Sequence, residues 1–130
     1  HPGEMSRLLG ISTAEVQRDR IGVATEYAVR YGVTLVLKGA RTIVASPDGS
    51  AYINTTGTSG MATGGTGDVL TGIIAGLLAQ GYSGPGAAAL GVWLHGRAGE
   101  EAARRRGHPA SLPATSSMPS KTYASDGTGV

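Results

Sequence analysis

The segment Gly60–Gly72, with the sequence GMATGGTGDVLTG, places one carboxylate, that of Asp68, among five glycines. The apolar run VLTGIIAGLLA begins at the next residue, so the pattern predicts a glycine-rich loop that leads into the N-terminus of a buried helix. The first N–H groups of such a helix lack intrahelical partners and, with the helix dipole, favour an anion such as phosphate. Glycines allow the backbone to approach that anion closely. The predicted anion hole comprises Gly64, Gly65, Thr66 and Gly67.

Tight packing of the loop against the helix explains these glycines equally well, and an aspartate at a helix N-terminus is most often a cap. Two familiar phosphate-binding motifs are excluded. No Gly-Lys-Ser/Thr triplet closes the loop, so it is not a Walker A loop, and Leu70 stands where the last glycine of a dinucleotide-binding motif would fall. The catalytic hypothesis makes Asp68 a general base, which accepts a proton from an attacking alcohol while backbone amides stabilise the transferred phosphoryl group.

The surrounding sequence predicts the elements that must position this loop. Helices are predicted at residues 2–9, from the Ser12 capping box to Gly32, and at residues 69–79 and 86–106. A strand is predicted at residues 33–38, followed by a hairpin of RTIVAS and AYIN around Pro47-Asp48-Gly49. This order predicts an α/β layered domain. Residues 108–130 are rich in Ser, Pro and Thr and are predicted to form an unstructured tail.

Composition narrows the classes of function. The net charge of +2, and an arginine cluster at residues 104–106 without interleaved aromatic residues, argue against nucleic-acid binding. The apolar run at residues 69–79 is too short to span a bilayer, and no signal peptide is visible, so no membrane role is expected. The absence of cysteine excludes disulfides and thiolate metal sites and fits a reducing, cytoplasmic location. No cluster of residues has metal-ligand spacing.

The string GTGD before a buried helix resembles the anion-hole and base motif of the ribokinase-like family of small-molecule kinases. The longer string GMATGGTGDVLTGIIAGLLAQG, together with HPGEMSRLLG and LKGARTIVASPDG, is similar to one branch, the nucleotide-dependent NAD(P)H-hydrate dehydratases. These motifs cover residues 1–107, which resemble the C-terminal part of the family's domain. The resemblance implies a ribokinase-like fold, with a central, mostly parallel sheet flanked by helices. It also implies an activity: repair of the S-epimer of hydrated NADH or NADPH.

The resemblance further implies a mechanism and site residues. ADP or ATP, accompanied by Mg²⁺, phosphorylates the ring hydroxyl, and phosphate is then eliminated. Asp68 is the implied base, and His1 and Asp68 contact the hydrated dinucleotide. Lys38, Gly39, Ala40, Arg41, Thr42 and Gly67 are implied to contact the adenine nucleotide. Positive charge on Lys38 and Arg41, at the end of a strand, suits a polyphosphate. Without the resemblance, these two residues are interpreted as solvated loop charges, and His1 as a residue that flanks a helix.

Two other functions stay open at this point. A vitamin-precursor kinase with the same anion hole would release a stable phosphorylated product, and a nucleotide-binding fragment would release none. Asn54 and Thr56, just before the loop, are further candidates for the nucleotide site without an assigned role. The chain begins at His1 and lacks the family's opening strands and helices, so we expect exposed apolar faces and little activity from these 130 residues alone. The full-length product is expected to be the enzyme and to form a homo-oligomer, a tetramer. ADP and ATP both stay open as the donor, and ADP is favoured.

Overall fold

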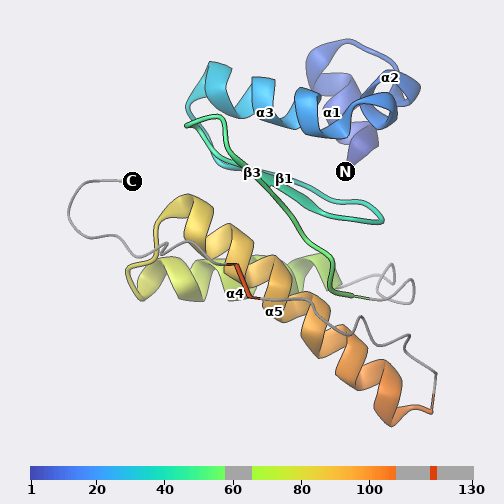
Figure 1. The fold of residues 1–130 in the computed structure, drawn as a ribbon, viewed down its shortest axis with the longest axis vertical. Coiled ribbons are helices and arrows are strands. Elements are labelled where there is room, and N and C mark those ends of the chain that lie inside the picture. Colours follow the sequence, from blue (N-terminus) through green and yellow to red (C-terminus); the bar gives the residue numbers. More distant parts are fainter. Residues whose placement is uncertain (58–65, 108–117, 120–130) are drawn as a thin grey trace. The chain divides into compact units, whose positions relative to one another are not determined.

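The computed structural model describes residues 1–57, 66–107 and 118–119. The chain divides into two compact units, His1–Ile53 and Asn54–Val130, and each is described by itself. The predicted order of helices and strands is confirmed, except that one predicted helix is two helices. The elements are, in chain order, α1 (Pro2–Leu9), α2 (Thr13–Arg18), α3 (Arg20–Tyr31), β1 (Leu35–Leu37), β2 (Ile43–Ala45), β3 (Ala51–Ile53), α4 (Thr66–Ala79) and α5 (Gly84–Arg105) (Figure 1).

Glycine ends α1 and α3 where the sequence predicts it. Gly10 and Gly32 follow the two helices with φ angles of 68° and 62°, in the left-handed region that a glycine adopts without steric cost. The Gly10 N–H donates to the Ser6 carbonyl oxygen at 2.9 Å and so satisfies an acceptor of the last helical turn. These local signals set the length of both helices.

The single helix predicted between Ser12 and Gly32 is interrupted at Asp19. Asp19 has φ −143° and ψ 66°, which is not helical, and its Oδ1 accepts a hydrogen bond of 3.1 Å from the Gly22 N–H. The side chain thereby caps a new helix, α3, because aspartate competes with the backbone for hydrogen bonds at such positions. The apolar spacing runs through Asp19 without interruption, so it gives no sign of the break. The prediction of a single helix was wrong here. The predicted cap at Ser12 is confirmed, since its Oγ accepts from the Glu15 N–H at 3.1 Å.

The three strands form an antiparallel sheet in the order β1-β2-β3. Val44 of the central strand β2 pairs with Val36 of β1 and with Tyr52 of β3. Short connections between consecutive strands permit only antiparallel pairing, since a parallel pair needs a longer crossover. The predicted turn is confirmed: Gly49 has φ 91°, and the Asp48 Oδ1 accepts from the Ser50 N–H at 2.8 Å. The α/β class is confirmed, and the parallel strands implied by the resemblance are not among the strands described.

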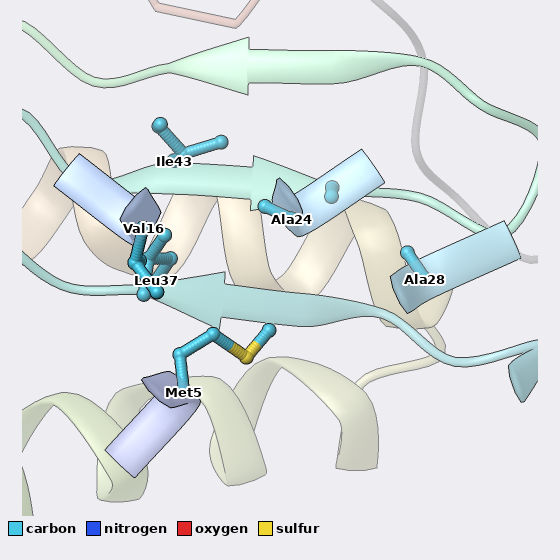
Figure 2. Close-up of a cluster of buried hydrophobic side chains, with 7 residues drawn as sticks. Met5, Val16, Ala24, Ala28, Leu37 and Ile43 are labelled. Carbon is cyan, nitrogen blue, oxygen red and sulfur yellow. The ribbon is translucent and has the colours of Figure 1, made fainter. Parts of the chain in front are cut away.

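The core of the first unit lies where α1, α2 and α3 meet β1 and β2. Two alanines of α3, Ala24 and Ala28, are fully buried, and their small side chains let the helix lie close to the sheet. Figure 2 shows the labelled members of this cluster converging from the helices and strands. The buried cluster comprises Met5, Val16, Ala24, Ala28, Leu37, Ile43 and Ala45.

In the second unit, α4 packs against α5. Gly91 of α5 allows the contact, because a Cβ at that position would lie 2.7 Å from the Cγ1 atom of Ile74 in α4. Ser83 caps α5 by accepting from the Gly86 N–H at 3.2 Å. Other positions of α4 are open: Val69 is 57% and Leu78 is 47% exposed. The expectation of exposed apolar surface is therefore confirmed for this helix.

Neither α4, α5 nor any other helix in the described ranges combines the length and apolarity needed to cross a bilayer. The tail predicted for residues 108–130 lies outside the described residues except for residues 118 and 119.

Candidate active site

Asp68 lies in the first turn of α4, inside the helix and after its first residue, Thr66. The helix predicted at residues 69–79 is therefore confirmed, and it begins three residues earlier, at Thr66. The Asp68 side chain is exposed, and within the described part of the chain its carboxylate makes no hydrogen bond or ion pair. A carboxylate in this state is free to accept a proton or a hydrogen bond from a ligand.

The backbone of α4 offers its first N–H groups at the same turn. Gly67 is half-buried beside Asp68, and its carbonyl oxygen accepts from the Thr71 hydroxyl at 3.0 Å. The free N–H groups of a helical first turn and the helix dipole favour a negatively charged group. Two members of the predicted anion hole, Gly64 and Gly65, lie outside the described residues, so the anion hole stays a prediction.

The predicted nucleotide-binding segment forms the connection between β1 and β2. Lys38 and Arg41 are exposed, and neither forms an ion pair or hydrogen bond with another described residue. The segment thus presents two uncompensated cations a few residues apart. Of the remaining members, Gly39 and Ala40 are exposed and Thr42 is half-buried.

Arg20 of α3 supports this connection, a role that sequence reasoning missed. Its Nη2 donates to the Leu37 carbonyl oxygen at 3.3 Å, at the end of β1. Its guanidinium also packs against Gly39, because a Cβ on Gly39 would lie only 2.8 Å from the Arg20 Cζ. Arg20 therefore fixes the backbone on both sides of Lys38. The contact joins residues 17 positions apart, and no local pattern in the sequence predicts it.

His1 precedes α1 as its N-cap. The imidazole Nδ1 accepts a hydrogen bond of 3.2 Å from the Gly3 N–H, and the side chain is exposed. This is the helix-flanking position that the residues alone suggest. The predicted site residues are divided between the units: His1 and residues 38–42 belong to the first unit, and Gly67 and Asp68 to the second.

The segment that precedes the glycine-rich loop is bound to α5. The Asn54 Nδ2 donates to the Val92 carbonyl oxygen at 3.2 Å, and the Thr56 hydroxyl donates to that of Trp93 at 3.0 Å. Asn54 and Thr56, candidates without a role in the sequence, thus have a structural one. In the part of the chain that the structure describes, no three His, Asp or Glu side chains gather as metal ligands.

A family model described as NAD(P)H-hydrate dehydratase matches residues 1–120. This chain belongs to that family. The match agrees with the resemblance of the three sequence motifs and favours the dehydratase branch over a vitamin-precursor kinase.

Similar proteins carry the names of NAD(P)H-hydrate repair enzymes and dehydratases. The bifunctional NAD(P)H-hydrate repair enzyme Nnr of Moorella thermoacetica is 60% identical over 112 residues, which are 86% of this chain and 21% of that protein. The ADP-dependent (S)-NAD(P)H-hydrate dehydratase of Neisseria meningitidis serogroup B is 47% identical over 123 residues, 95% of this chain and 42% of its own length. The chain thus spans less than half the length of these two dehydratase-family relatives.

A solved structure shows the same fold. The ADP/ATP-dependent NAD(P)H-hydrate dehydratase from Bacillus subtilis, co-crystallised with ATP/Mg²⁺ and soaked with CoA, aligns with a TM-score of 0.75 and 40% identity. The alignment covers 83% of this chain and 39% of the Bacillus subtilis chain. The predicted ribokinase-like fold is confirmed, and this dehydratase-family chain contains a fragment of it.

Proposed function

We propose that this chain supplies the nucleotide-binding segment and the general base of an ADP- or ATP-dependent (S)-NAD(P)H-hydrate dehydratase, a lyase of metabolite repair. The observation that carries the proposal is the exposed, unpaired carboxylate of Asp68 in the first turn of α4. Membership of the family supports it, and so do the names of the relatives. Both substrates, the hydrated dinucleotide and the adenine nucleotide, are part of the proposal.

In the proposed first step, the ring hydroxyl of the hydrate attacks the terminal phosphoryl group of the nucleotide. A new P–O bond forms to the ring oxygen, the P–O bond to the AMP or ADP leaving group breaks, and Asp68 accepts the hydroxyl proton. Elimination then breaks the C–O bond, releases phosphate and a ring proton, and restores NADH or NADPH. The N–H groups at the start of α4 stabilise charge on the transferred group.

The nucleotide contacts proposed for residues 38–42 and Gly67 place two cations, Lys38 and Arg41, near the polyphosphate. His1 is proposed to contact the hydrated dinucleotide. Mg²⁺ usually keeps several waters and binds through one or two carboxylates and substrate phosphates. Among the described residues no three His, Asp or Glu side chains gather as ligands, so we propose that Mg²⁺ arrives with the phosphates of the nucleotide and that Asp68 keeps its role as the base. The ion would neutralise phosphate charge when bound.

A homo-oligomeric, tetrameric assembly and a cytoplasmic location are proposed for the full-length protein. The exposed apolar residues of α4 and its open glycines leave surface for subunit packing.

The test uses the full-length protein incubated with hydrated NADH and either ADP or ATP. Recovery of the absorbance of reduced nicotinamide, with release of phosphate, is the expected result. Asp68→Asn should abolish this signal and leave nucleotide binding intact. Glu26→Gln, which changes an exposed carboxylate of α3, is the control and should keep full activity.

A stable phosphorylated product without recovered NADH would indicate a kinase instead. Full activity of the Asp68→Asn variant would refute the assignment of the base. The 130-residue chain alone is expected to show little or no turnover.

A further inference from the structure

Residues 54–57 lie along α5 and contact four of its residues. Two contacts are the hydrogen bonds of Asn54 and Thr56 to helix carbonyl oxygens described above. A third is a hydrogen bond of 2.9 Å from the Gly57 N–H to the Glu100 Oε1. The fourth is packing, because a Cβ on Gly96 would lie 2.7 Å from the Thr56 backbone carbonyl carbon. A glycine inside a helix is destabilising relative to alanine, and this close approach is a physical reason for a glycine at position 96.

Glu100 is unusual among these residues because it carries a charge and is only 2% exposed. A buried carboxylate requires partners for its lone pairs. It has two: the Gly57 N–H on Oε1, and the Arg97 Nη1 at 3.0 Å on Oε2. Gly57 has φ 110°, a backbone conformation that residues with a side chain rarely adopt. Glu100 therefore binds the N–H of a residue at which the chain turns.

The helix α5 also contacts α4, the helix that follows the glycine-rich segment in the sequence. α4 begins at Thr66, two residues before Asp68, and packs on α5 through Ile74 and Gly91. One rigid helix therefore contacts the chain both before and after residues 58–65.

We propose that Glu100 is a positioning residue for the phosphoryl-transfer step: by holding the Gly57 N–H, it fixes on α5 the last described residue before the predicted glycine-rich segment and Asp68. This proposal rests on the proposed function. Gly96 assists by allowing Thr56 to reach the helix. Glu100 touches no substrate in this role, and it acts through the backbone of residues 54–57.

The test compares three variants of the full-length protein. Glu100→Ala removes the acceptor for the Gly57 N–H. Glu100→Gln keeps one oxygen that can accept from the Gly57 N–H, and it loses the charge and the second acceptor, which binds Arg97. Glu101→Ala is the control, because Glu101 is the next residue of α5 and bonds only the arginines 104 and 105 in the described part of the helix. Measurements are kcat and KM for ADP, hydrogen exchange of the Gly57 amide, and unfolding by urea.

We expect Glu100→Ala to lower kcat by about tenfold to a hundredfold, as misplacement of a reacting group does, with KM for ADP unchanged. The Gly57 amide should exchange faster in this variant alone. Glu100→Gln should recover most of kcat and of the amide protection, and Glu101→Ala should match the wild type. A purely structural role would lower stability in Glu100→Ala without this separation of kcat from KM.

Wild-type kcat in a folded Glu100→Ala variant overturns the proposal. So does a folded Glu100→Gln variant that protects the Gly57 amide and is nevertheless as impaired as Glu100→Ala. If Glu100→Ala does not fold, Glu100→Gln decides: amide protection and kcat that are kept together or lost together support the proposal, and loss of one without the other overturns it. Absence of turnover in the wild type is a different result, because it would refute the proposed function.

Discussion

Thr56 occupies the space that a side chain on Gly96 would need. An ideal Cβ built on Gly96 would lie 2.7 Å from the Thr56 Cβ, a separation that requires the chain to shift. We therefore expect Gly96→Ala to destabilise the 130-residue chain by about 1 to 3 kcal/mol, the usual cost of forcing extra atoms into a packed contact. Urea unfolding followed by circular dichroism measures the change.

Gly72 provides a matched comparison on α4. A Cβ there would meet nothing within 4 Å, so Gly72→Ala adds helix propensity without a clash. The same unfolding experiment should show a gain of about 0.5 to 1 kcal/mol. Equal effects of alanine at Gly72 and Gly96 would contradict the packing described for residues 54–57.

A substitution at Gly32 measures the free-energy cost of a left-handed backbone conformation without a steric clash. The φ of Gly32 is 62°, and a Cβ at this position would also have no neighbour within 4 Å. Gly32→Ala should therefore cost about 1 to 2 kcal/mol through the left-handed conformation alone. Gly32→Asn should cost less, because asparagine tolerates this region. Thermal unfolding of the two variants should separate them, and identical losses would indicate a steric cause.

Arg20 should affect nucleotide binding although it lies outside the predicted site. It holds the Leu37 carbonyl oxygen and packs against Gly39, on either side of Lys38. Arg20→Ala should weaken ADP binding to the full-length protein by about 1 kcal/mol, the worth of one hydrogen bond. Titration calorimetry measures this, with Arg7→Ala as control because Arg7 is exposed on α1. Unchanged affinity in the Arg20 variant would refute its supporting role.

Lys38 and Arg41 should contribute charge to nucleotide binding and little to stability. Each is exposed and unpaired in the described part of the chain, so Lys38→Met and Arg41→Met should shift the unfolding free energy by less than about 0.5 kcal/mol. Both should weaken ADP binding, and the loss should shrink as salt concentration rises, because salt screens exposed charges. Arg18→Met is the control. Affinity that is independent of both cations would place the polyphosphate elsewhere.

Much of the fold follows from short-range signals. Gly10, Gly32 and the turn around Gly49 are readable because each needs a left-handed glycine within a few residues of an apolar segment. The break at Asp19 was missed because the apolar spacing runs through it, and only the capping side chain distinguishes two helices from one.

In the candidate site too, residues in contiguous motifs could be predicted, and residues whose partners are distant in the sequence could not. Asp68 and the cations of residues 38–42 were found because their motifs are contiguous in sequence. Glu100 was missed because its partner Gly57 lies 43 positions away and nothing in either neighbourhood specifies the other. The glycines at 91 and 96 inside α5 are the one available signal, since an interior helical glycine suggests close contact with another segment.

Trp93, the single tryptophan of the chain, provides the carbonyl oxygen that receives the Thr56 hydroxyl. Its indole is half-buried on the helix to which residues 54–57 are attached. The chain consequently contains a built-in fluorophore at the place where the glycine-rich segment is anchored. Emission from this one ring can therefore be followed, without any label, in variants that alter the contact between residues 54–57 and α5.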